Sequence, residues 1–380
     1  MGENKMKVLM QSRKNFFDLR GGDTVQLEKT KAELEKLGVE VDFSLEFEPD
    51  LSKYDLVHLS NVTRIQETYL HVLNAKRQGK PIALSTIYWP MEEFEKNGQI
   101  GLRKFINSHL SINREEKIKA FARYIKDKNS RNISTKNLWK IGYTNMQKYV
   151  VNNVDYFLPN SEMEMDAFCE SFGIKKANYK VIPNAIDANI AKIQEDADVP
   201  QELELYRDAI ICVGRIEPRK NQLSLVKALD QSGYKLVLVG AVSNNQKKYF
   251  SAIKKIMDRN PDFHYIPSVE NSKLYQLYKV CRVSTLPSWL DTPGLVSLEA
   301  GVMGCNLAIS SKGSTTEYFS DYAEYCLPDD IPGIKKAIDN AYAKEKNNQL
   351  KQRILKNYTW EIAGRKTLEA YNELLKSVHK

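Results

Sequence analysis

The chain has 380 residues, of which 42% are hydrophobic and 27% charged. This length exceeds what one hydrophobic core usually serves, so two domains are expected, and the composition excludes wholesale disorder and fibrous repeats. The formal charge of +8 favours an anionic partner such as a nucleotide, a lipid surface or a nucleic acid.

The five cysteines lack the spacings of metal sites, and an odd number fits poorly with a disulfide framework. No apolar run approaches the roughly 18 to 20 residues of a membrane-spanning helix, and the first residues lack the apolar stretch of a signal peptide. These features predict a cytoplasmic protein with reduced thiols. Peripheral association with the inner face of the plasma membrane is kept as a further hypothesis.

The first part of the chain alternates short apolar runs with helical patterns. The run Lys7–Met10 predicts a strand, followed by Gly21, Gly22 and a helix that ends near Gly38. Such alternation indicates a doubly wound parallel sheet. Further elements are predicted as strands at Val39–Phe43, Asp55–Leu59, Pro81–Ile87, Tyr156–Leu158 and Tyr179–Ile182, and as a helix around Glu67–Gln78.

Residues 102–148 are helical in pattern and strongly basic. The apolar residues Ile118, Phe121 and Ile125 recur at the spacing of an amphipathic helix. A solvated helix face is the favoured interpretation, and contact of residues 103–148 with an anionic membrane or a lipid-linked acceptor is the alternative. The basic residues are Arg103, Lys104, Lys117, Lys119, Arg123, Lys126, Lys128, Arg131, Lys136 and Lys140.

The second half contains another strand and helix series. Residues 188–208 are polar and acidic with little apolar periodicity, which predicts a linker between domains at 1–187 and 209–357. Residues 358–380 predict a terminal helix that packs back toward the N-terminal domain. The strands predicted in the second series are Ile210–Val213, Lys235–Val239, Phe263–Ile266, Val283–Leu286 and Leu307–Ile309.

The segment ICVGRIEPRKNQ carries the first chemical motif. A buried strand ends at Gly214, a helix starts near Asn221, and Arg215 and Lys220 lie on the loop between them. Ligands of open parallel sheets bind beyond the carboxyl ends of the strands. Arginine and lysine there can neutralise phosphate oxygens and the charge of a departing nucleotide. The segment predicts a diphosphate site, and a pair of exposed surface cations is the alternative.

The segment PSWLDTPGLVSLEAGVMGC carries the second motif. Gly294 lies where a loop turns into a helix, so backbone amides at the helix start can meet a phosphate directly. Glu299, two turns along, is then within reach of a ribose. The alternative is a capped surface helix with incidental acidic residues.

Together these motifs resemble signatures of the fourth family of GT-B glycosyltransferases, the glycosyl transferases group 1. That family carries a G-R-x-x-x-x-K turn, followed by two acidic residues with seven others between them. The resemblance implies an α/β protein of GT-B architecture, with two Rossmann-like doubly wound domains facing across a cleft. The N-terminal domain would bind the acceptor and the C-terminal domain the nucleotide-sugar.

The resemblance also implies residue roles. Arg215 and Lys220, on the turn that Gly214 opens, would contact the donor pyrophosphate and act with Asp291 in catalysis. Asp291 would meet the donor sugar. The remaining donor-binding positions are Gly294 and Leu295 at the phosphates through their backbone, Glu299 at the ribose, and Thr292 and Pro293 in the intervening loop.

Several positions depart from the family pattern or match it weakly. Asp291 replaces the usual glutamate, and Thr292–Pro293 replaces the usual Gly-Phe, which bears on the choice of sugar. Gly21 and Gly22 match the family's glycine-rich loop, although a tight turn without a ligand explains them equally well.

Other residues near these motifs are assigned mainly structural roles. Many relatives carry a histidine near the reacting sugar where this chain has Tyr88 or Trp89, for which core or stacking positions are favoured. His58 is interpreted as a core histidine. Asn184 and Asp187 are interpreted as hinge residues and Glu317 as a helix-start residue.

The resemblance implies a retaining hexosyltransferase, EC 2.4, which moves a sugar from a nucleotide-diphosphate donor to a hydroxyl of a surface polysaccharide or lipid-linked glycan. No pair of inward carboxylates, no DxD-like metal motif on a strand end and no metal-ligand cluster occurs at a convincing spacing, so neither a metal nor another cofactor is predicted. A non-catalytic GT-B subunit of a polysaccharide-assembly complex and a sugar-nucleotide epimerase are the alternatives. A nucleic-acid partner is not predicted, because no binding module accompanies the charge.

Overall fold

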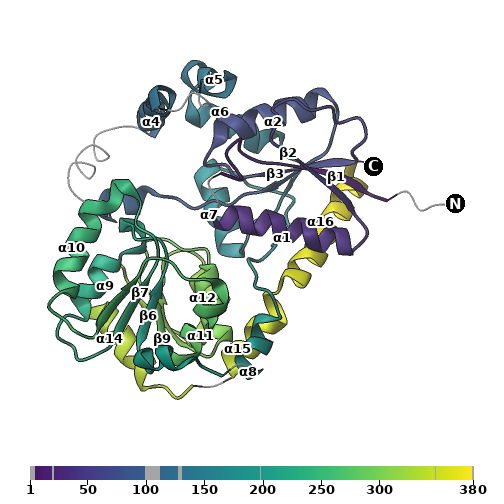
Figure 1. The fold of residues 1–380 in the computed structure, drawn as a ribbon. Helices are drawn as coiled ribbons and strands as arrows, with labels where there is room; N and C mark the ends of the chain where they lie inside the picture. Colours follow the sequence, from purple (N-terminus) through teal and green to yellow (C-terminus); the bar gives the residue numbers. More distant parts are fainter. Residues whose placement is uncertain are drawn as a thin grey trace. The chain divides into compact units, whose positions relative to one another are not determined.

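The computed structural model describes residues 5–18, 21–98, 112–126, 131–196, 198–346 and 348–378. The chain divides into two compact units (Figure 1). The first comprises Met1–Pro90, Phe105–Pro183 and Trp360–Lys380, and the second Met91–Lys104 and Asn184–Thr359. The predicted N-terminal domain, 1–187, therefore includes residues 91–98, which the structure groups with the second unit.

The first unit contains a five-stranded parallel sheet in the order β2-β1-β3-β4-β5. Strands β3 and β4 are buried along their whole length, as expected for central parallel strands covered on both faces. In this doubly wound order the sequence of strands reverses between β1 and β3. The strands are β1 Lys7–Gln11, β2 Glu40–Ser44, β3 Leu56–Ser60, β4 Ile82–Ser85 and β5 Tyr156–Phe157.

The strand predicted at Tyr179–Ile182 is wrong. The structure retains only an isolated parallel bridge between Phe157 and Tyr179. Its neighbour β5 has only two residues, so it offers too short an edge for a further strand to pair along.

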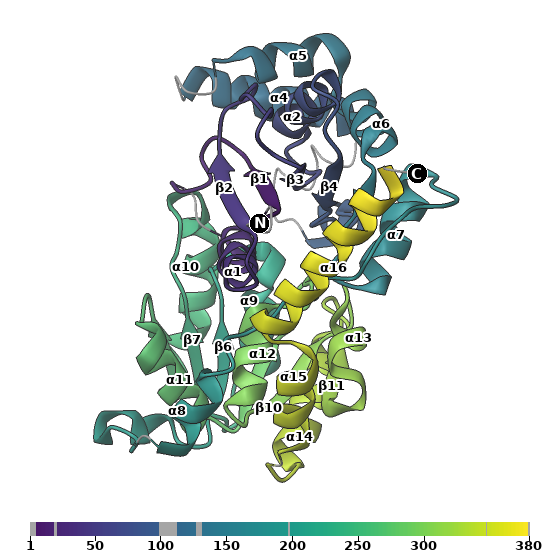
Figure 2. The same ribbon diagram turned by 90° about the vertical axis from the view of Figure 1, so that its right-hand side faces the viewer.

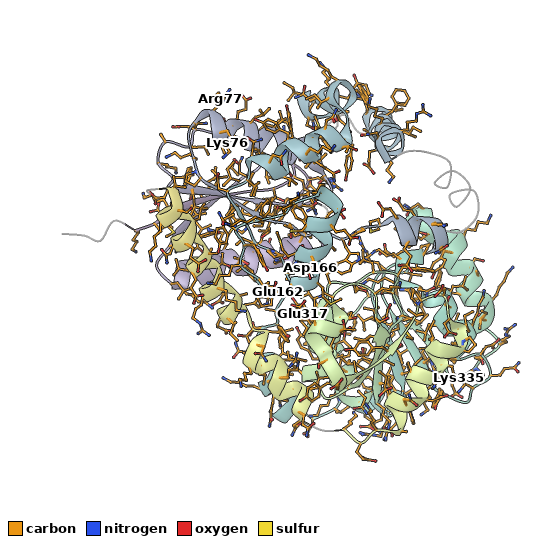
Figure 3. The ribbon with its side chains drawn as sticks, turned by 180° about the vertical axis from the view of Figure 1, so that it is seen from behind. Lys76, Arg77, Glu162, Asp166, Glu317 and Lys335 are labelled. Carbon is orange, nitrogen blue, oxygen red and sulfur yellow. The ribbon has the colours of Figure 1, made fainter. Side chains whose placement is uncertain are left out.

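Helices pack against one another around this sheet (Figures 1 and 2). The terminal helix α16 packs on α1, where a Cβ on Gly364 would lie 2.4 Å from the Cβ of Glu33. Helices α4 and α5 pack on α6, and α5 also packs on α2. Lys76 and Arg77 in the last turn of α2 complement the helix dipole (Figure 3). The helices are α1 Gly22–Lys36, α2 Ile65–Arg77, α4 Ile112–Lys126, α5 Ile133–Ile141, α6 Tyr143–Asn153, α7 Glu162–Phe172 and α16 Trp360–Val378.

The second unit contains a six-stranded parallel sheet in the order β11-β10-β9-β6-β7-β8. Counted within the unit, this is the 3-2-1-4-5-6 order of a Rossmann-type sheet, and the strand order reverses between β6 and β9. The strands are β6 Ile210–Val213, β7 Leu236–Val239, β8 Phe263–Ile266, β9 Val283–Leu286, β10 Asn306–Ser310 and β11 Ala323–Cys326.

Residues 188–208, predicted as a linker, contain helix α8 (Ile190–Asp196) and the 3-10 turn η3 (Gln201–Tyr206). Ile190 and Leu203 lie in the hydrophobic core of the second unit. The remaining helical elements are η1 Phe94–Gly98, η4 Pro218–Lys220, α9 Gln222–Ala228, η5 Asn244–Gln246, α10 Lys247–Met257, α11 Asn271–Val280, α12 Leu295–Val302, α13 Thr315–Phe319, η6 Ser320–Tyr322, α14 Ile331–Ala343 and α15 Gln349–Asn357.

None of the described helices combines the length and the apolar character that a membrane span needs.

Candidate functional site

Two loops leave the second sheet at the point where its strand order reverses. Residues 214–221 follow β6 and residues 287–294 follow β9, and these two strands pair directly. Parallel strands end at the same edge of a sheet, so both loops emerge there together. The backbone N–H of Trp289 donates to the carbonyl of Arg219 at 2.9 Å and ties one loop to the other.

Close backbone contacts fix the shape of this edge. Gly240, directly after β7, has a φ of +151°, and a Cβ there would lie 2.0 Å from the carbonyl oxygen of Gly214. Gly313, after β10, has a φ of +88°, and its Cβ would lie 1.9 Å from the carbonyl oxygen of Asp291. Only glycine fits at these two positions, so both glycines hold neighbouring loops in contact.

Lys220 and Asp291, both predicted site residues, form an ion pair across the two loops. Lys220 Nζ lies 2.8 Å from Asp291 Oδ1 and 3.0 Å from Oδ2. Both side chains are nearly buried, at 13% and 10% exposure. Burial opposes ionisation of Asp291, but the charges of Lys220 and Arg219 outweigh it, so the pKa of the carboxyl lies below its usual value. Asp291 is therefore ionised at neutral pH.

Two arginines flank this ion pair in different ways. Arg219 Nη1 donates to the carbonyl of Leu290 at 2.9 Å, and Arg219 Nη2 lies 3.1 Å from Glu217. The side chain of Arg215 is 69% exposed, and its guanidinium reaches Glu217 only at 3.8 Å. Arg219 therefore stabilises the loop 287–294 that follows β9. The exposed guanidinium of Arg215 has N–H donors available to an incoming anion.

Helix α12 begins directly after the second loop. Gly294, with a φ of +85°, precedes Leu295, and no side chain caps this helix start. The first backbone amides of α12 are thus available to an anionic group. The loop itself is supported by Asn184, whose Nδ2 donates to the carbonyl of Thr292 at 2.7 Å, and by Pro293, which is buried.

Glu299 lies further along α12 and is partly buried. Among the described residues its carboxylate has no hydrogen-bond partner, and burial raises the pKa of Glu299 to about 7. Burial and then the charge of Glu299 raise the pKa of the neighbouring Tyr275 to about 12. A ligand whose hydroxyl groups donate hydrogen bonds to this carboxylate would stabilise its ionised form.

Sequence reasoning did not predict that residues 91–98, which follow the first part of the first unit along the chain, belong to the second unit. The turn η1 packs on η4 in the second unit, and Glu93 forms an ion pair with Lys312 at 2.7 Å. A Cβ on Gly98 would lie 2.9 Å from the ring of Trp289. We call Met91–Gly98 the strap, because it packs against the loop that carries Asp291.

Asn221 was also missed as a structural residue of the site. It adopts a left-handed φ of +59°, and its Nδ2 donates to the carbonyls of Pro287 at 3.0 Å and Pro328 at 2.7 Å. An Asn after a basic turn is the only sequence signal for this role. Glu317 lies in the first turn of α13, as expected for a helix-start residue (Figure 3).

Gly21 and Gly22 lie in the first unit, at the start of α1. Gly21 has an extended φ of −148°, and a Cβ on Gly22 would meet nothing within 4 Å, so neither position requires glycine for its backbone conformation. The loop before them is held by an ion pair between Arg13 and Asp23. These two glycines belong to the first unit, whereas Lys220 and Asp291 belong to the second.

His58 is a core residue, as predicted. Its Nδ1 lies 2.6 Å from the hydroxyl of Tyr371 on the terminal helix, and its Nε2 lies 2.8 Å from Ser85 Oγ. Burial lowers the pKa of His58 to about 3, so the ring is neutral. Both ring nitrogens are occupied, which leaves His58 no free group for chemistry.

The loop after β4, where relatives carry their histidine, is fixed by a buried carboxylate. Glu164 accepts hydrogen bonds from the hydroxyl of Thr86 and, at 2.9 Å, from the backbone N–H of Tyr88. The ring of Tyr88 packs against Phe168 and Phe172. Of the core or stacking positions predicted for Tyr88, the structure shows packing against the core of the first unit, with edge-on and tilted ring contacts.

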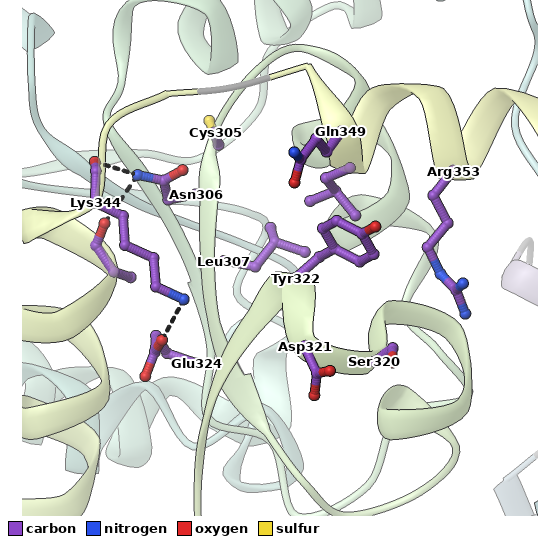
Figure 4. Close-up of a pocket in the computed structure, with 12 residues that line it drawn as sticks. Cys305, Asn306, Leu307, Ser320, Asp321, Tyr322, Glu324, Lys344, Gln349 and Arg353 are labelled. Carbon is purple, nitrogen blue, oxygen red and sulfur yellow. Dashed lines mark hydrogen bonds and ion pairs between the residues drawn. The ribbon is translucent and has the colours of Figure 1, made fainter.

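A pocket of about 560 Å³ lies elsewhere in the second unit (Figure 4). Its lining includes Asn306, which opens β10, and Glu324 in β11, where Lys344 pairs with Glu324. It therefore opens at the amino edge of the parallel sheet, opposite the loops of Lys220 and Asp291. In the described part of the chain, no cluster of three or more His, Cys, Asp or Glu side chains is suited to hold a metal ion.

Comparison with known proteins finds a family similarity over the part of the chain that contains this site. Residues 194–358 match the family model described as glycosyl transferases group 1, and this stretch lies within the second unit and contains both loops. The second unit is therefore similar to that family. The group 1 match thus includes Arg215, Lys220, Asp291 and Glu299, which supports the resemblance on which their roles were predicted.

The individual relatives of the chain are distant in sequence. Over 240 residues the chain is 26% identical to a glycogen synthase of Mycobacterium tuberculosis, and the alignment covers 60% of this chain and 56% of that protein. The chain thus spans little more than half the length of this curated relative.

Solved structures share the fold along almost the whole chain. The sucrose-phosphate synthase of Thermosynechococcus elongatus is 14% identical with a TM-score of 0.69, covering 98% of this chain and 100% of its own. An E. coli trehalose-6-phosphate structure bound with UDP-2-fluoro glucose is 11% identical with a TM-score of 0.66, covering 97% and 99%. Identities this low establish the fold alone, and the predicted GT-B fold is confirmed.

Proposed function

We propose that the chain is a glycosyltransferase that uses a nucleotide-diphosphate sugar as its donor. The observation that carries the proposal is the buried Lys220–Asp291 ion pair beside the exposed Arg215, at the strand-order reversal of a group 1 unit. This is the position at which open α/β sheets bind nucleotides.

In the proposed reaction, the bond between the anomeric carbon and a phosphate oxygen breaks, and its electron pair stays on the phosphate. The acceptor oxygen forms the new bond to the anomeric carbon and gives its proton to an oxygen of the departing diphosphate. Charge grows on the departing diphosphate, so Arg215, Lys220 and the first amides of α12 would stabilise the transition state more than the ground state. Because these groups already supply positive charge, we propose that no divalent cation is needed.

Asp291 has two proposed tasks. It holds the Lys220 ammonium group, which keeps that charge in place before the donor arrives. Each carboxylate oxygen has further acceptor capacity, through which Asp291 would bind a hydroxyl of the donor sugar. The shorter reach of aspartate relative to the family's glutamate would then influence which sugar is accepted.

Glu299 is the proposed ribose contact. Its carboxylate lies on the helix whose first amides would meet the phosphates, and it has no partner among the described residues. Two ribose hydroxyls would supply donors and stabilise its ionised form.

The finer parts of the proposal rest on the family resemblance. These are a hexose-type sugar, retention of anomeric configuration, and a surface-polysaccharide or lipid-linked glycan as acceptor. The E. coli structure bound with UDP-2-fluoro glucose makes a uridine donor the first to be tested.

A second candidate is a non-catalytic binding subunit of a polysaccharide-assembly complex. Two observations favour it. Both oxygens of Asp291 contact Lys220, and Tyr88 packs into an aromatic cluster near the position of the family's histidine. Such a subunit would bind the nucleotide-sugar without turning it over.

A donor screen in the presence of EDTA tests the proposal. The full chain is incubated with uridine, guanosine and adenosine diphosphate sugars and a panel of glycan and lipid-linked acceptors, and release of nucleoside diphosphate is measured. Release with one donor class, lost in Arg215→Ala and Lys220→Met but kept in Lys227→Met, is the expected result. Binding without turnover would instead support the subunit, and equal activity in all variants would refute the site.

A further inference from the structure

Helices α4 and α5 of the first unit expose large apolar side chains. We define the apolar patch as Ile118, Phe121 and Ile125 on α4 and Ile133 on α5. Their exposed fractions are 55%, 56%, 58% and 55%. Exposed apolar residues are common singly, but several on neighbouring elements mark an interaction surface.

The spacing of these residues places them on one face of α4. Ile118, Phe121 and Ile125 are three and four residues apart, so they project from the same side of the helix. Ala120, on another face, is 3% exposed and belongs to the core of the first unit. The helix therefore has a face that packs on the protein and a separate apolar face that meets solvent, whereas an ordinary surface helix is polar there.

The same region holds most of the protein's net charge. Residues 112–153 contain ten Lys and Arg and three Asp and Glu, which gives a net charge of +7, against +8 for the entire chain. Arg114, Lys119, Lys136 and Lys140 are exposed on α4 and α5. Apolar and basic side chains thus occur together in one short stretch.

Contacts between α4 and α5 make the surface preformed. Arg131 donates to the carbonyl of Tyr124 at 2.9 Å, and its guanidinium lies 5.5 Å from the centre of that ring. Trp139 on α5 packs against Tyr124 and Phe121, with ring centres 5.2 and 6.2 Å apart. These aromatic and basic groups join the two helices, and aromatic residues of this kind favour the headgroup level of a bilayer.

We propose that the α4–α5 surface docks the protein on an anionic phospholipid bilayer. The apolar patch would enter the boundary between headgroups and acyl chains, and the surrounding Lys and Arg side chains would meet lipid phosphates. The high net positive charge favours a lipid surface over a protein partner, whose interface core would be depleted of charge. The apolar patch has no use in binding a nucleic-acid backbone.

Vesicle sedimentation with the full chain tests this proposal without any donor, so its outcome is independent of glycosyltransferase activity. Vesicles are made of phosphatidylcholine alone or with about one-third phosphatidylglycerol. The wild type is expected to sediment with the anionic vesicles and to remain in solution with the neutral ones. Raised salt is expected to weaken the binding, because the basic residues contribute.

Two variants separate the apolar and charged contributions. Replacement of Ile118, Phe121 and Ile125 by serine should lower the partition coefficient at least about tenfold. Lys136→Glu with Lys140→Glu should lower it about tenfold at low salt and less at high salt. Matched controls in the second unit are Leu205→Ser, which is 53% exposed, and Lys247→Glu with Lys248→Glu on α10.

Equal thermal unfolding midpoints of variants and wild type would show that the surface changes leave the fold intact. The proposal is overturned if the wild type ignores anionic vesicles, binds neutral ones as tightly, or loses as much binding in the controls as in the α4–α5 variants. Self-association that is abolished by the serine variant, without vesicle binding, would identify the patch as a protein interface and would equally overturn it.

Discussion

In the first unit, His58 in the middle of β3 is buried and bonded to Ser85 and Tyr371, and the buried Glu164 is bonded to the loop that follows the carboxyl end of β4. At the carboxyl edge of the second sheet, Arg215 is mostly exposed, and Glu299 has no hydrogen-bond partner among the described residues. In the first unit these polar groups form hydrogen bonds within the chain and stabilise the fold. In the second unit they can still form hydrogen bonds and ion pairs with a ligand.

This difference indicates how to recognise a binding edge. A buried polar group whose partners all come from the chain stabilises the structure, whereas a half-buried group without partners costs stability unless a ligand supplies them. Variants of these second-unit groups should therefore change binding and catalysis, and variants of the first-unit groups should change stability alone.

The largest effect is expected for Lys220→Met. Loss of one charge opposite the departing diphosphate should lower kcat/KM by about 10²–10³-fold. Asp291 would also be left buried without its counter-ion, which should cost about 3–5 kcal/mol of unfolding free energy. Steady-state kinetics and denaturant unfolding measure the two effects.

A second substitution separates these effects. Adding Asp291→Asn to Lys220→Met removes the uncompensated charge, so stability should recover while activity stays low. Lys227→Met, an exposed lysine on α9, is the control and should behave as wild type. Recovery of activity together with stability would show that Lys220 serves only the fold.

Glu299→Gln should raise the KM for the donor about tenfold, because a carboxylate accepts ribose hydrogen bonds better than an amide. The pKa of about 7 also predicts a stability effect. A carboxyl whose folded pKa is raised binds its proton more tightly in the folded state, so stability is lost as pH rises from about 4.5 through about 7.

Glutamine at position 299 cannot ionise and avoids this loss. At about pH 8 the variant should be more stable than the wild type by up to about 3 kcal/mol, and at about pH 4.5 the two should be equal. Denaturant unfolding at both pH values measures this. The same difference at both pH values would contradict the assigned pKa.

In the first unit, His58→Leu should cost about 1–3 kcal/mol, because the hydroxyls of Ser85 and Tyr371 lose a buried partner. Once folded, the variant should bind nucleotide as the wild type does, within about twofold, by isothermal titration. A large loss of affinity in the folded variant would break the distinction between the two units.

The smallest effect is expected in the strap. Glu93 and Lys312 are 49% and 32% exposed, so Glu93→Gln should cost less than about 1 kcal/mol. Thermal unfolding would detect it as a small shift, with Glu92→Gln, the exposed neighbouring residue, as the control. A shift as large as that of His58→Leu would show that the strap stabilises the site more than its exposure suggests.

The parts of the site that the sequence predicts correctly depend on local pattern. The apolar runs of β6 and β9 indicate buried parallel strands, and the motifs directly after them place Lys220 and Asp291 at one edge. The ion pair between these two side chains was not predicted from the sequence and is shown by the structure.

What sequence reasoning missed depends on contacts between distant residues. Arg219 binds the carbonyl of Leu290, 71 residues away, and Asn184 binds that of Thr292, 108 residues away. Helix α8 was missed because its segment is acidic and has few apolar positions, although Ile190 enters the core. No periodicity in a single sequence encodes such contacts.

The central claim is that Lys220 and its neighbours bind the diphosphate of the donor. Titrating the wild type and Lys220→Met with UDP and with UMP in EDTA tests it most directly. The wild type should prefer the diphosphate by more than about tenfold, and the variant should lose most of that preference. An equal preference in both proteins would contradict the assignment of Lys220 to the phosphate site.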